Sequence, residues 1–312
     1  MRVFVAGATG AIGSPLVSAL VGRGHQVTGT TRSADGAKRI EAAGATPAIL
    51  DALDRDAMIG AVTEAAPDVI VHELTAIPPD LDIRRIDDAF VQTNRLRTEG
   101  TDILIAAGQA AGVRRFVAQS FAAWTYAREG SWVKTEDDRV DDDPLPPVRR
   151  TFEALRYLER ATLAAPFESI VLRYGWFYGE GSGLSRGGAM VDAIRKRRFP
   201  IVGPGRGIWS FIHVHDAAAA TALAVERGEP GVYNITDDEP APVREWLPAF
   251  AAAVGAPPPF RVPTWLGRLL GGKITVVVMN ELRGSSNAKA KRAFDWKLRY
   301  PTWRTGFREG LA

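Results

Sequence analysis

The chain has 312 residues, of which 46% are hydrophobic and 24% charged, values typical of a globular protein with a sizeable apolar core. Its formal net charge is only +3 and its Lys and Arg residues are dispersed, so the composition does not favour a nucleic-acid partner. The absence of Cys excludes disulfides, thiolate nucleophiles and Cys-ligated metals. Of the four His residues, only those in His213-Val214-His215-Asp216 have a metal-like spacing, and we do not favour a metal there.

The first part of the chain alternates short apolar runs with amphipathic stretches. The apolar runs predict buried strands at residues 2–6, 25–30, 46–50, 68–72, 115–119 and 169–172. The stretches between them predict helices at residues 11–22, 36–43, 54–65, 87–111 and 148–164. Strands and helices that alternate in this way form right-handed crossovers. We therefore predict an α/β fold, a doubly wound parallel sheet of the Rossmann type.

A glycine-rich run follows the first predicted strand and opens the first predicted helix. It reads Gly7-Ala8-Thr9-Gly10-Ala11-Ile12-Gly13. The first glycine permits the tight turn, the second lets the backbone approach a pyrophosphate, and the third allows close packing of helix on strand. Because free N–H groups at a helix N-terminus attract phosphates, the run predicts a dinucleotide-binding loop that includes Thr9 and Ile12.

The end of the second predicted strand indicates which dinucleotide is bound. An NAD-specific site usually has an acidic residue about 20 positions beyond the glycine loop, which binds the ribose 2′-hydroxyl. This chain has Thr30-Thr31-Arg32-Ser33 there, with no carboxylate. A guanidinium suits a 2′-phosphate and hydroxyls add neutral donors, so Thr31 and Arg32 favour NADP over NAD. The alternative is an Arg that faces solvent without a ligand.

After Tyr174 the composition changes, with frequent Gly and Pro and less regular helices. A segment of this kind is typical of a smaller lobe that packs over the carboxyl ends of the strands and closes a substrate cleft. We predict an NADP-binding domain over residues 1–174 and a smaller substrate-binding lobe over residues 175–312. Some segments of the lobe are expected to return to the main domain.

Further motifs follow the glycine loop in a characteristic order: Asp51, Leu74, Asn94, Ser120, 172–175 with 178–179, 211–217, 232–234, and 287–291 with Trp296. Together they resemble the extended or atypical short-chain dehydrogenase/reductase family, in its epimerase/dehydratase branch, over nearly the whole chain. The resemblance implies that Asp51 contacts the adenine and that Leu74 borders the cofactor. It also makes Asn94 and Tyr174 candidate cofactor-binding residues.

The catalytic pair of that family is a Tyr-x-x-x-Lys on the helix after the fifth strand. The Lys and the nicotinamide ribose lower the pKa of the Tyr, which exchanges a proton with substrate while hydride moves. No Lys of this chain has a Tyr four positions before it. Aligning Glu159 with the acidic residue that commonly follows the motif places Thr151 at the Tyr position and Leu155 at the Lys position. Tyr157 lies about 120° around the helix from Thr151, so we interpret it as a boundary or interface aromatic.

Other side chains are candidates for the chemistry. Ser120 and Tyr126 follow the fifth strand: the Ser120 hydroxyl is expected beside the nicotinamide, where it could hold a substrate oxygen, and Tyr126 ranks first as proton donor. Tyr174 and Tyr178, after the sixth strand, are the other phenols considered, and plain packing is the alternative for each. An apolar cleft suited to a flat organic substrate is predicted from Trp124, Tyr126, Trp132, Trp176 and Phe177.

The favoured hypothesis is an NADP(H)-dependent oxidoreductase that reduces a carbonyl-like group on a small organic metabolite with a non-standard proton donor. Two alternatives stay open: a non-catalytic NADP(H)-binding sensor, and a non-redox isomerase or lyase. No targeting segment or membrane-length apolar run is visible, so we expect a cytoplasmic protein without a membrane partner or a metal. The helices at 87–111 and 148–164 are those through which members of the family commonly dimerise, so we expect a homodimer.

Overall fold

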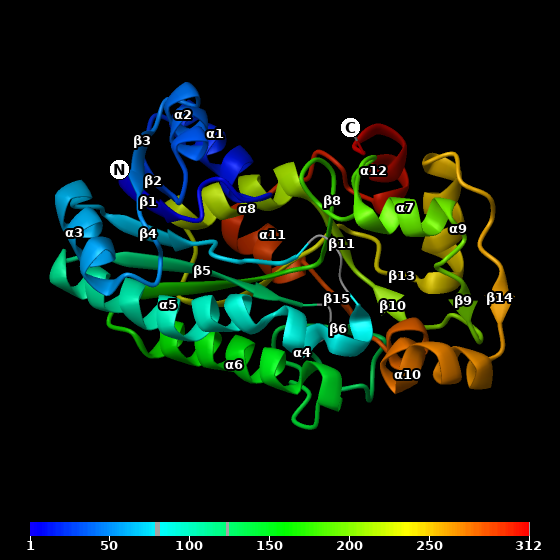
Figure 1. Cartoon of the computed structure of the whole chain (residues 1–312). Helices are drawn as coiled ribbons and strands as arrows, with labels where there is room; N and C mark the ends of the chain where they lie inside the picture. The colour runs from blue at the N-terminus through cyan, green and yellow to red at the C-terminus, as the bar shows by residue number, and fades with distance from the viewer. Residues whose placement is uncertain (79–81, 123–124, 312) are drawn as a thin grey trace.

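A computed structural model describes residues 1–78, 82–122 and 125–311 (Figure 1). Its centre is a seven-stranded parallel sheet with the strand order β12-β7-β5-β4-β1-β2-β3. The strands are β1 (Arg2–Ala6), β2 (Gln26–Thr31), β3 (Thr46–Ile49), β4 (Val69–His72), β5 (Arg115–Phe121), β7 (Glu168–Tyr174) and β12 (Gly231–Ile235). The predicted doubly wound fold is confirmed, and the six predicted strands begin and end within two residues of the observed ones.

Helices cover both faces of the sheet (Figure 1). One face packs against α1 (Gly13–Gly22), α2 (Ala34–Ala42), α8 (Val214–Glu226) and α11 (Ala288–Phe294). The other packs against α3 (Arg55–Ala65), α5 (Val91–Ala110) and α6 (Arg149–Ala164). Successive side chains of a strand point to opposite faces. Accordingly, Val3 and Val5 of β1 join the first core, and Phe4 and Ala6 join the second.

The prediction of one continuous helix over residues 87–111 is wrong, because the structure has two helices there. α4 (Ile86–Ala89) follows the short helix η1 (Ile83–Arg85) and ends at Phe90, whose φ of −99° and ψ of 11° interrupt the helix before α5. Ile86 and Phe90 pack into the core of the C-terminal lobe, whereas Leu96 and Leu104 of α5 pack on the sheet. The break lets one stretch of chain contribute to two cores.

A smaller lobe lies beyond the carboxyl ends of the strands (Figure 1). Its helices are α7 (Ala189–Arg195), α9 (Val243–Ala253), α10 (Thr264–Asn280) and α12 (Trp303–Glu309). Short strands pair as β8 (Trp176–Tyr178) with β11 (Phe211–His213), β9 (Ile201–Val202) with β14 (Arg261–Val262), β10 (Ile208–Trp209) with β13 (Ala241–Pro242), and β6 (Val133–Lys134) with β15 (Gly284–Ser285). A division of the chain at residue 174 stays a prediction.

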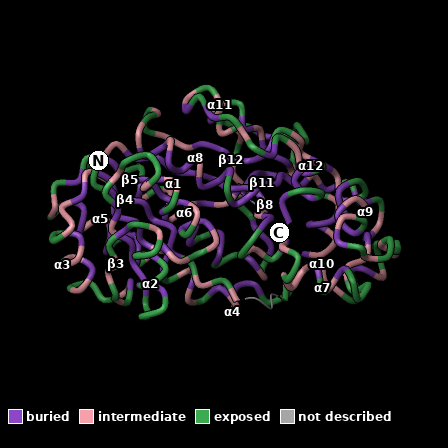
Figure 2. The backbone as a smooth tube through the Cα atoms, turned by 90° about the horizontal axis from the view of Figure 1, so that it is seen from above, coloured by how far each residue is buried: buried purple, intermediate pink, exposed green. Residues whose placement is uncertain are grey.

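The lobe has its own aromatic core. Trp176 stacks on Trp209 with ring centroids 4.1 Å apart, and Trp209 contacts Trp246 at 4.7 Å. Buried segments run through the interior of both the lobe and the sheet region (Figure 2). Across the described part of the chain, no helix combines the length and the apolar character needed to cross a bilayer.

Gly272 divides α10 into two parts. Its φ of 76° and ψ of 177° lie in a region that only glycine adopts readily, and the helix bends there. After the bend, Ile274 and Val277 are buried; before it, Trp265 and Leu269 are 68% and 74% exposed. The second part of α10 therefore forms a wall of the lobe interior.

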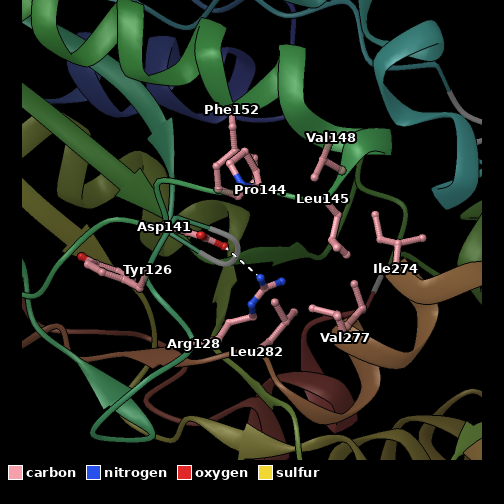
Figure 3. Close-up of a pocket in the computed structure, with 11 residues that line it drawn as sticks. Tyr126, Arg128, Asp141, Pro144, Leu145, Val148, Phe152, Ile274, Val277 and Leu282 are labelled. Carbon is pink, nitrogen blue, oxygen red and sulfur yellow. Dashed lines mark ion pairs between the residues drawn. The ribbon is translucent and has the colours of Figure 1, made fainter.

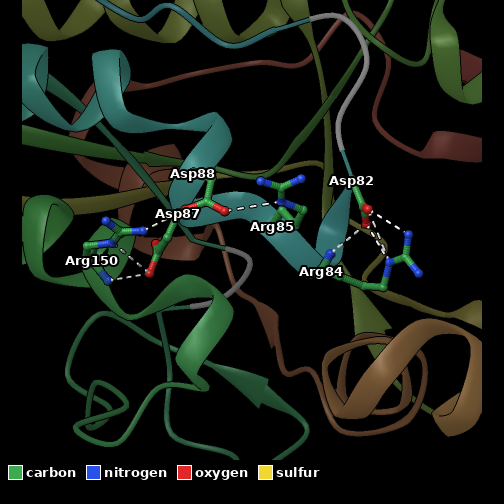
Figure 4. Close-up of polar contacts among 6 residues, drawn as sticks. All are labelled: Asp82, Arg84, Arg85, Asp87, Asp88 and Arg150. Atoms are coloured by element: carbon green, nitrogen blue, oxygen red, sulfur yellow. Dashed lines mark hydrogen bonds and ion pairs between the residues drawn. The ribbon is translucent and has the colours of Figure 1, made fainter.

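A carboxylate from α4 holds the first turn of α6 (Figure 4). The Asp87 side chain is 8% exposed, and its oxygens accept hydrogen bonds from the backbone N–H groups of Arg150 at 2.9 Å and Thr151 at 2.8 Å. The Thr151 hydroxyl also donates to Asp87 Oδ1 at 2.8 Å. Asp88 is 56% exposed and forms surface ion pairs with Arg85 and Arg150. Since the first N–H groups of a helix need acceptors, Asp87 fixes the start of α6.

We predict that Asp87→Ala lowers the free energy of unfolding by about 2 kcal/mol, because it removes a buried charged cap and leaves two backbone N–H groups unpaired. The control Asp88→Ala should leave stability nearly unchanged, since exposed ion pairs contribute little. Urea unfolding followed by circular dichroism measures both variants. Equal losses in the two would contradict the assignment.

Candidate active site

The loop between β1 and α1 has the geometry of a phosphate cradle. Gly7 has a φ of 94°, and a Cβ there would lie 2.7 Å from the carbonyl oxygen of Glu73. A Cβ on Gly13 would overlap the carbonyl oxygen of Gly7. An added Cβ on the exposed Gly10 would meet nothing closer than 3.4 Å. The loop is therefore tightly packed at Gly7 and Gly13 but open at Gly10. Because it lies at a helix N-terminus, this geometry fits a dinucleotide pyrophosphate.

The predicted ribose-binding residues lie beside this loop. Thr31 is 7% exposed at the end of β2, and its hydroxyl accepts a hydrogen bond from the Ser33 N–H at 3.4 Å. Arg32 is exposed, and its guanidinium has no hydrogen bond or ion pair within the described part of the chain. The exposed Asp51 accepts from the backbone N–H of Leu53 at 2.9 Å. The side chain of Arg32 is thus available to a ligand.

One cation near the loop was not among the predicted residues. Arg39 of α2 lines a small hollow together with Thr9 and Ser14. Ile12, the residue before α1, is 5% exposed and packs into the core. In the sequence, the signal for Arg39 is its position one or two turns into the second helix. Basic residues are common on helix surfaces, so this signal is weak.

The positions of the missing catalytic pair are both buried. Thr151 is 1% exposed, and its hydroxyl accepts a hydrogen bond from Asn94 Nδ2 at 3.3 Å while it donates to Asp87. Leu155 is 5% exposed, as is usual for an apolar residue on the inner face of a helix. Leu74, at the end of β4, is 7% exposed, and its carbonyl accepts from Gln119 at 3.1 Å. Neither Thr151 nor Leu155 presents a group that titrates near neutral pH.

Tyr174 lies in a buried chain of polar groups under the glycine loop. Its hydroxyl is 2.8 Å from Glu73 Oε1 and 2.7 Å from Thr221 Oγ1, and the Thr221 hydroxyl donates to the Ala217 carbonyl at 2.8 Å. As the contacts stand, the Tyr174 hydroxyl donates to the Glu73 carboxyl oxygen. Burial raises the pKa of Glu73 to about 8, although the hydrogen bond from Tyr174 opposes that rise.

Both predicted catalytic hydroxyls belong to one buried polar network. The Ser120 hydroxyl donates to Glu159 Oε1 at 2.6 Å. Arg173 donates two hydrogen bonds to Glu159, at 2.8 and 2.6 Å, and a third to the Tyr126 hydroxyl at 3.2 Å. Tyr126 in turn donates to Asn234 Oδ1 at 2.7 Å. The structure thus brings Ser120 and Tyr126 together through Arg173 and Glu159, and burial raises the pKa of Tyr126.

An open hollow lies beside this network (Figure 3). Its polar end is formed by Tyr126, Arg128 and Asp141. Its apolar walls come from the segment before α6, from α6 itself and from the second part of α10: Pro144, Leu145, Val148, Phe152, Ile274, Val277, Val278 and Leu282. The hollow is the candidate substrate pocket.

The aromatic residues predicted to line the cleft mostly lie elsewhere. Tyr126 lines the hollow, but Trp176 stacks in the lobe core, and Trp132 is 42% exposed with its ring under the Arg283 guanidinium. Phe177 packs near Tyr174 at 5.2 Å, and Trp124 lies outside the described residues. The apolar character of the pocket instead comes from aliphatic side chains and Phe152.

Two further candidates lie away from the hollow. Tyr178 is fully buried among Phe307 and His213 in the lobe, and burial raises its pKa above the usual range. His213 lies 2.9 Å from the carbonyl oxygen of Gly310. In the ranges 1–78, 82–122 and 125–311, no group of three or more His, Asp or Glu side chains is arranged to hold a metal ion.

The chain is similar to one protein family and to several named reductases. The model of the NAD dependent epimerase/dehydratase family matches residues 3–236. A "3-diazoavenalumate denitrifying reductase" from Streptomyces sp is 43% identical over 309 residues, 98% of this chain and 99% of that protein. A "4-hydroxy-2-methyl-3-oxo-4-farnesyl-3,4-dihydroquinoline-1-oxide ketoreductase" from Stigmatella aurantiaca is 31% identical over 250 residues, 79% of this chain and 71% of that protein.

Solved structures share the fold at lower identity. The UDP-glucose 4-epimerase of Thermus thermophilus, in complex with NAD, aligns with a TM-score of 0.72 and 23% identity, covering 100% of this chain and 98% of that one. At this identity the likeness concerns the fold alone. The overall fold of the chain is thus shared with this solved structure.

The buried Glu73 predicts a pH-dependent stability. The folded chain keeps the Glu73 proton up to a pH of about 8, whereas the unfolded chain loses it around the ordinary pKa of 4.5. Stability should therefore fall as pH rises through this window, by at most about 1.4 kcal/mol per pH unit from this group. Glu73→Gln keeps the shape but does not titrate, so its stability relative to the parent should rise between pH 5 and 8.

Chemical denaturation at a series of pH values tests this expectation. Glu64→Gln, at an exposed position of α3, is the control and should follow the parent throughout. If the difference between Glu73→Gln and the parent does not change with pH, Glu73 is not protonated in the folded chain.

Proposed function

Because the chain belongs to the NAD dependent epimerase/dehydratase family and is an oxidoreductase, we propose that it is an NADPH-dependent reductase that replaces the diazo group of an aromatic substrate, in its diazonium form, with hydride. The predicted family and enzyme class are both confirmed by the family match and by reductases up to 43% identical. These relatives do not favour the sensor or the non-redox alternative. The name of the Streptomyces relative specifies a diazo group on an organic anion, which supports the proposed substrate.

This proposal rests on one observation: Thr151 and Leu155 of α6 stand at the two positions of the family's catalytic pair. Reduction of a carbonyl consumes a hydride and a proton, and the Tyr of the family pair supplies the proton. Replacement of a diazonium group by hydride forms a C–H bond, breaks a C–N bond and releases N2, so it consumes no proton. Thr151 and Leu155 supply no acid, and the hydroxyls of Ser120 and Tyr126 are bound to buried partners. A reaction that needs no protein acid suits this arrangement.

The glycine loop supports a nicotinamide dinucleotide as the source of reducing equivalents. When bound, the reduced nicotinamide supplies a hydride. We propose that the N–H groups at the start of α1, with Gly7, Thr9, Gly10, Ile12 and Gly13, hold the pyrophosphate. Thr31 and Arg32 would bind the 2′-phosphate, Asp51 the adenine, and Leu74, Asn94 and Tyr174 would border the remainder of the site. The solved Thermus thermophilus structure of the same fold contains NAD.

The second candidate function is reduction of a carbonyl group. The Stigmatella aurantiaca relative is named a ketoreductase, and it is 31% identical over 250 residues. In this case Ser120 would hold the substrate oxygen and Tyr126 would donate the proton. Donation by Tyr126 requires its hydroxyl to leave Asn234 and its buried position, which is 3% exposed. That requirement favours the diazo reaction.

We also propose a homodimer formed through α5 and α6. The two helices pack side by side, and Tyr157 donates to Asp102 across their outer surface at 2.7 Å. Val91 and Leu163 on these helices are 52% and 44% exposed, which suits a contact surface. A cytoplasmic location stays a prediction.

We predict that the parent binds NADPH more tightly than NADH and that Arg32→Ala weakens NADPH binding about 10- to 100-fold, because a charge-assisted contact with the 2′-phosphate is lost. NADH binding should hardly change. Lys38→Ala is the control, since Lys38 is 77% exposed and pairs with Asp35 on the same helix. Calorimetry measures all three proteins. A variant that retains the preference for NADPH would show that Arg32 faces solvent only.

A labelled hydride distinguishes the two candidate reactions. With an aromatic diazonium acid and NADPH deuterated at C4, deuterium should appear on the ring carbon that carried nitrogen, with one N2 released per NADPH oxidised. The same reaction in D2O with unlabelled NADPH should place no deuterium there. With an aromatic ketone, deuterium on the carbinol carbon would support the second candidate. NADPH oxidation without release of N2 would rule out the diazo reaction.

A further inference from the structure

Arg128 places a charged group inside the apolar hollow. Its side chain is 26% exposed, and its Nη2 lies 3.6 Å from Asp141 Oδ2, too far for a hydrogen bond. Among the residues that the structure describes, the Arg128 guanidinium makes no hydrogen bond. Figure 3 shows the guanidinium between Asp141 and the apolar side chains of Leu145 and Val277. Its N–H groups therefore point into a space where a ligand can reach them.

A second guanidinium, that of Arg283, lies next to Arg128 but is not among the residues that line the hollow. Arg283 donates to the backbone carbonyl of Arg128 at 2.9 Å and lies over the Trp132 ring at 3.9 Å. Burial lowers the pKa of Arg283, the Glu281 carboxylate raises it, and the nearby Arg128 lowers it. Asp141, 13% exposed, is the carboxylate that faces Arg128, and the exposed Glu281 is the carboxylate that acts on Arg283. Of the two carboxylates, only Asp141 therefore faces into the hollow.

A partly buried guanidinium with unused donors is costly unless an anion completes it. A carboxylate accepts two parallel hydrogen bonds from Arg, which a neutral amide cannot reproduce. The remaining walls are aliphatic and include Phe152, so they suit a flat apolar body. A diphosphate would bring at least two negative charges into the hollow, whose walls offer few further hydrogen-bond donors.

We propose that Arg128 binds the carboxylate of an aromatic acid whose ring packs against Phe152, Leu145 and Val277. For the reacting group the inference rests on the proposed function, and it adds that the substrate is a carboxylic acid. Arg128 is thus a specificity-determining residue. The position of the carboxylate in the hollow would fix how far the reacting carbon extends toward the nucleotide site.

Binding of a non-reducible acid tests the proposal without turnover. The probes are 4-hydroxycinnamate and its amide, titrated by calorimetry into the NADPH-loaded protein. The parent should bind the acid roughly 10- to 100-fold more tightly than the amide, as expected for a charge-assisted pair. Arg128→Met should bring the two affinities within about threefold of each other, with amide binding retained as evidence of an intact pocket. Arg128→Lys should restore part of the preference.

The control is Arg139→Met, which removes an exposed arginine of the same loop that pairs with Glu129 and Asp142. It should keep the parental preference. Asp141→Asn removes the competing carboxylate and should strengthen binding of the acid. Equal binding of acid and amide by the parent, no binding of either, or an unchanged preference in Arg128→Met would overturn the proposal.

Turnover separates failure of this inference from failure of the proposed function. If the protein reduces a diazo acid and its methyl ester with equal kcat/KM, the reaction stands and the carboxylate site is wrong. If the acid binds in preference to the amide in an Arg128-dependent way but no diazo compound is reduced, the carboxylate site stands and the reaction is wrong.

Discussion

The buried ion pair between Glu159 and Arg173 holds the candidate active site together. The side chains are 12% and 5% exposed, so removal of either partner would leave a buried charge, at a cost of about 3–5 kcal/mol. Burial alone would lower the pKa of Arg173, but its hydrogen bonds with Glu159 raise that pKa above the ordinary value. The pair joins α6 to β7, and through Ser120 and Tyr126 it fixes β5 and the loop that continues to Arg128. The same ion pair therefore connects the candidate pocket to the sheet.

The parts of the fold that depend on local patterns were predictable from the sequence. The apolar runs gave the six predicted strands almost to the residue, because buried parallel strands are continuous apolar segments. The glycine spacing predicted the loop. The structure shows why Gly7 and Gly13 are required, because a Cβ at either position would lie too close to backbone atoms. The break at Phe90 was missed because the helical pattern continues across it, and only the packing of Ile86 and Phe90 into another core requires it.

The site was less predictable because it joins residues that are distant in the chain. Arg173 meets Tyr126, 47 positions earlier, and Asn234 meets Tyr126 from 108 positions later. No local pattern marks Arg128 as different from the exposed Arg139, since burial by α10 is what distinguishes the two. The same reasoning explains why Ser120 and Tyr126 could be predicted to lie close together, whereas the engagement of their hydroxyls with Glu159 and Asn234 could not.

The position of β12 affects how the chain can acquire its structure during synthesis. β12 pairs with β7 along Gly231–Ile235, yet the chain between them first forms α7 and the short strands β8, β9, β10 and β11 of the lobe, and α8 of the sheet region. Asp216 at the start of α8 is then bound by the backbone of Arg299 and Tyr300, and Asn287 reaches back to Thr236. A nascent chain that ends near residue 174 leaves the β7 edge unpaired, which invites wrong pairing with other chains. The seven-stranded sheet therefore cannot be complete until the chain has been synthesised at least as far as β12.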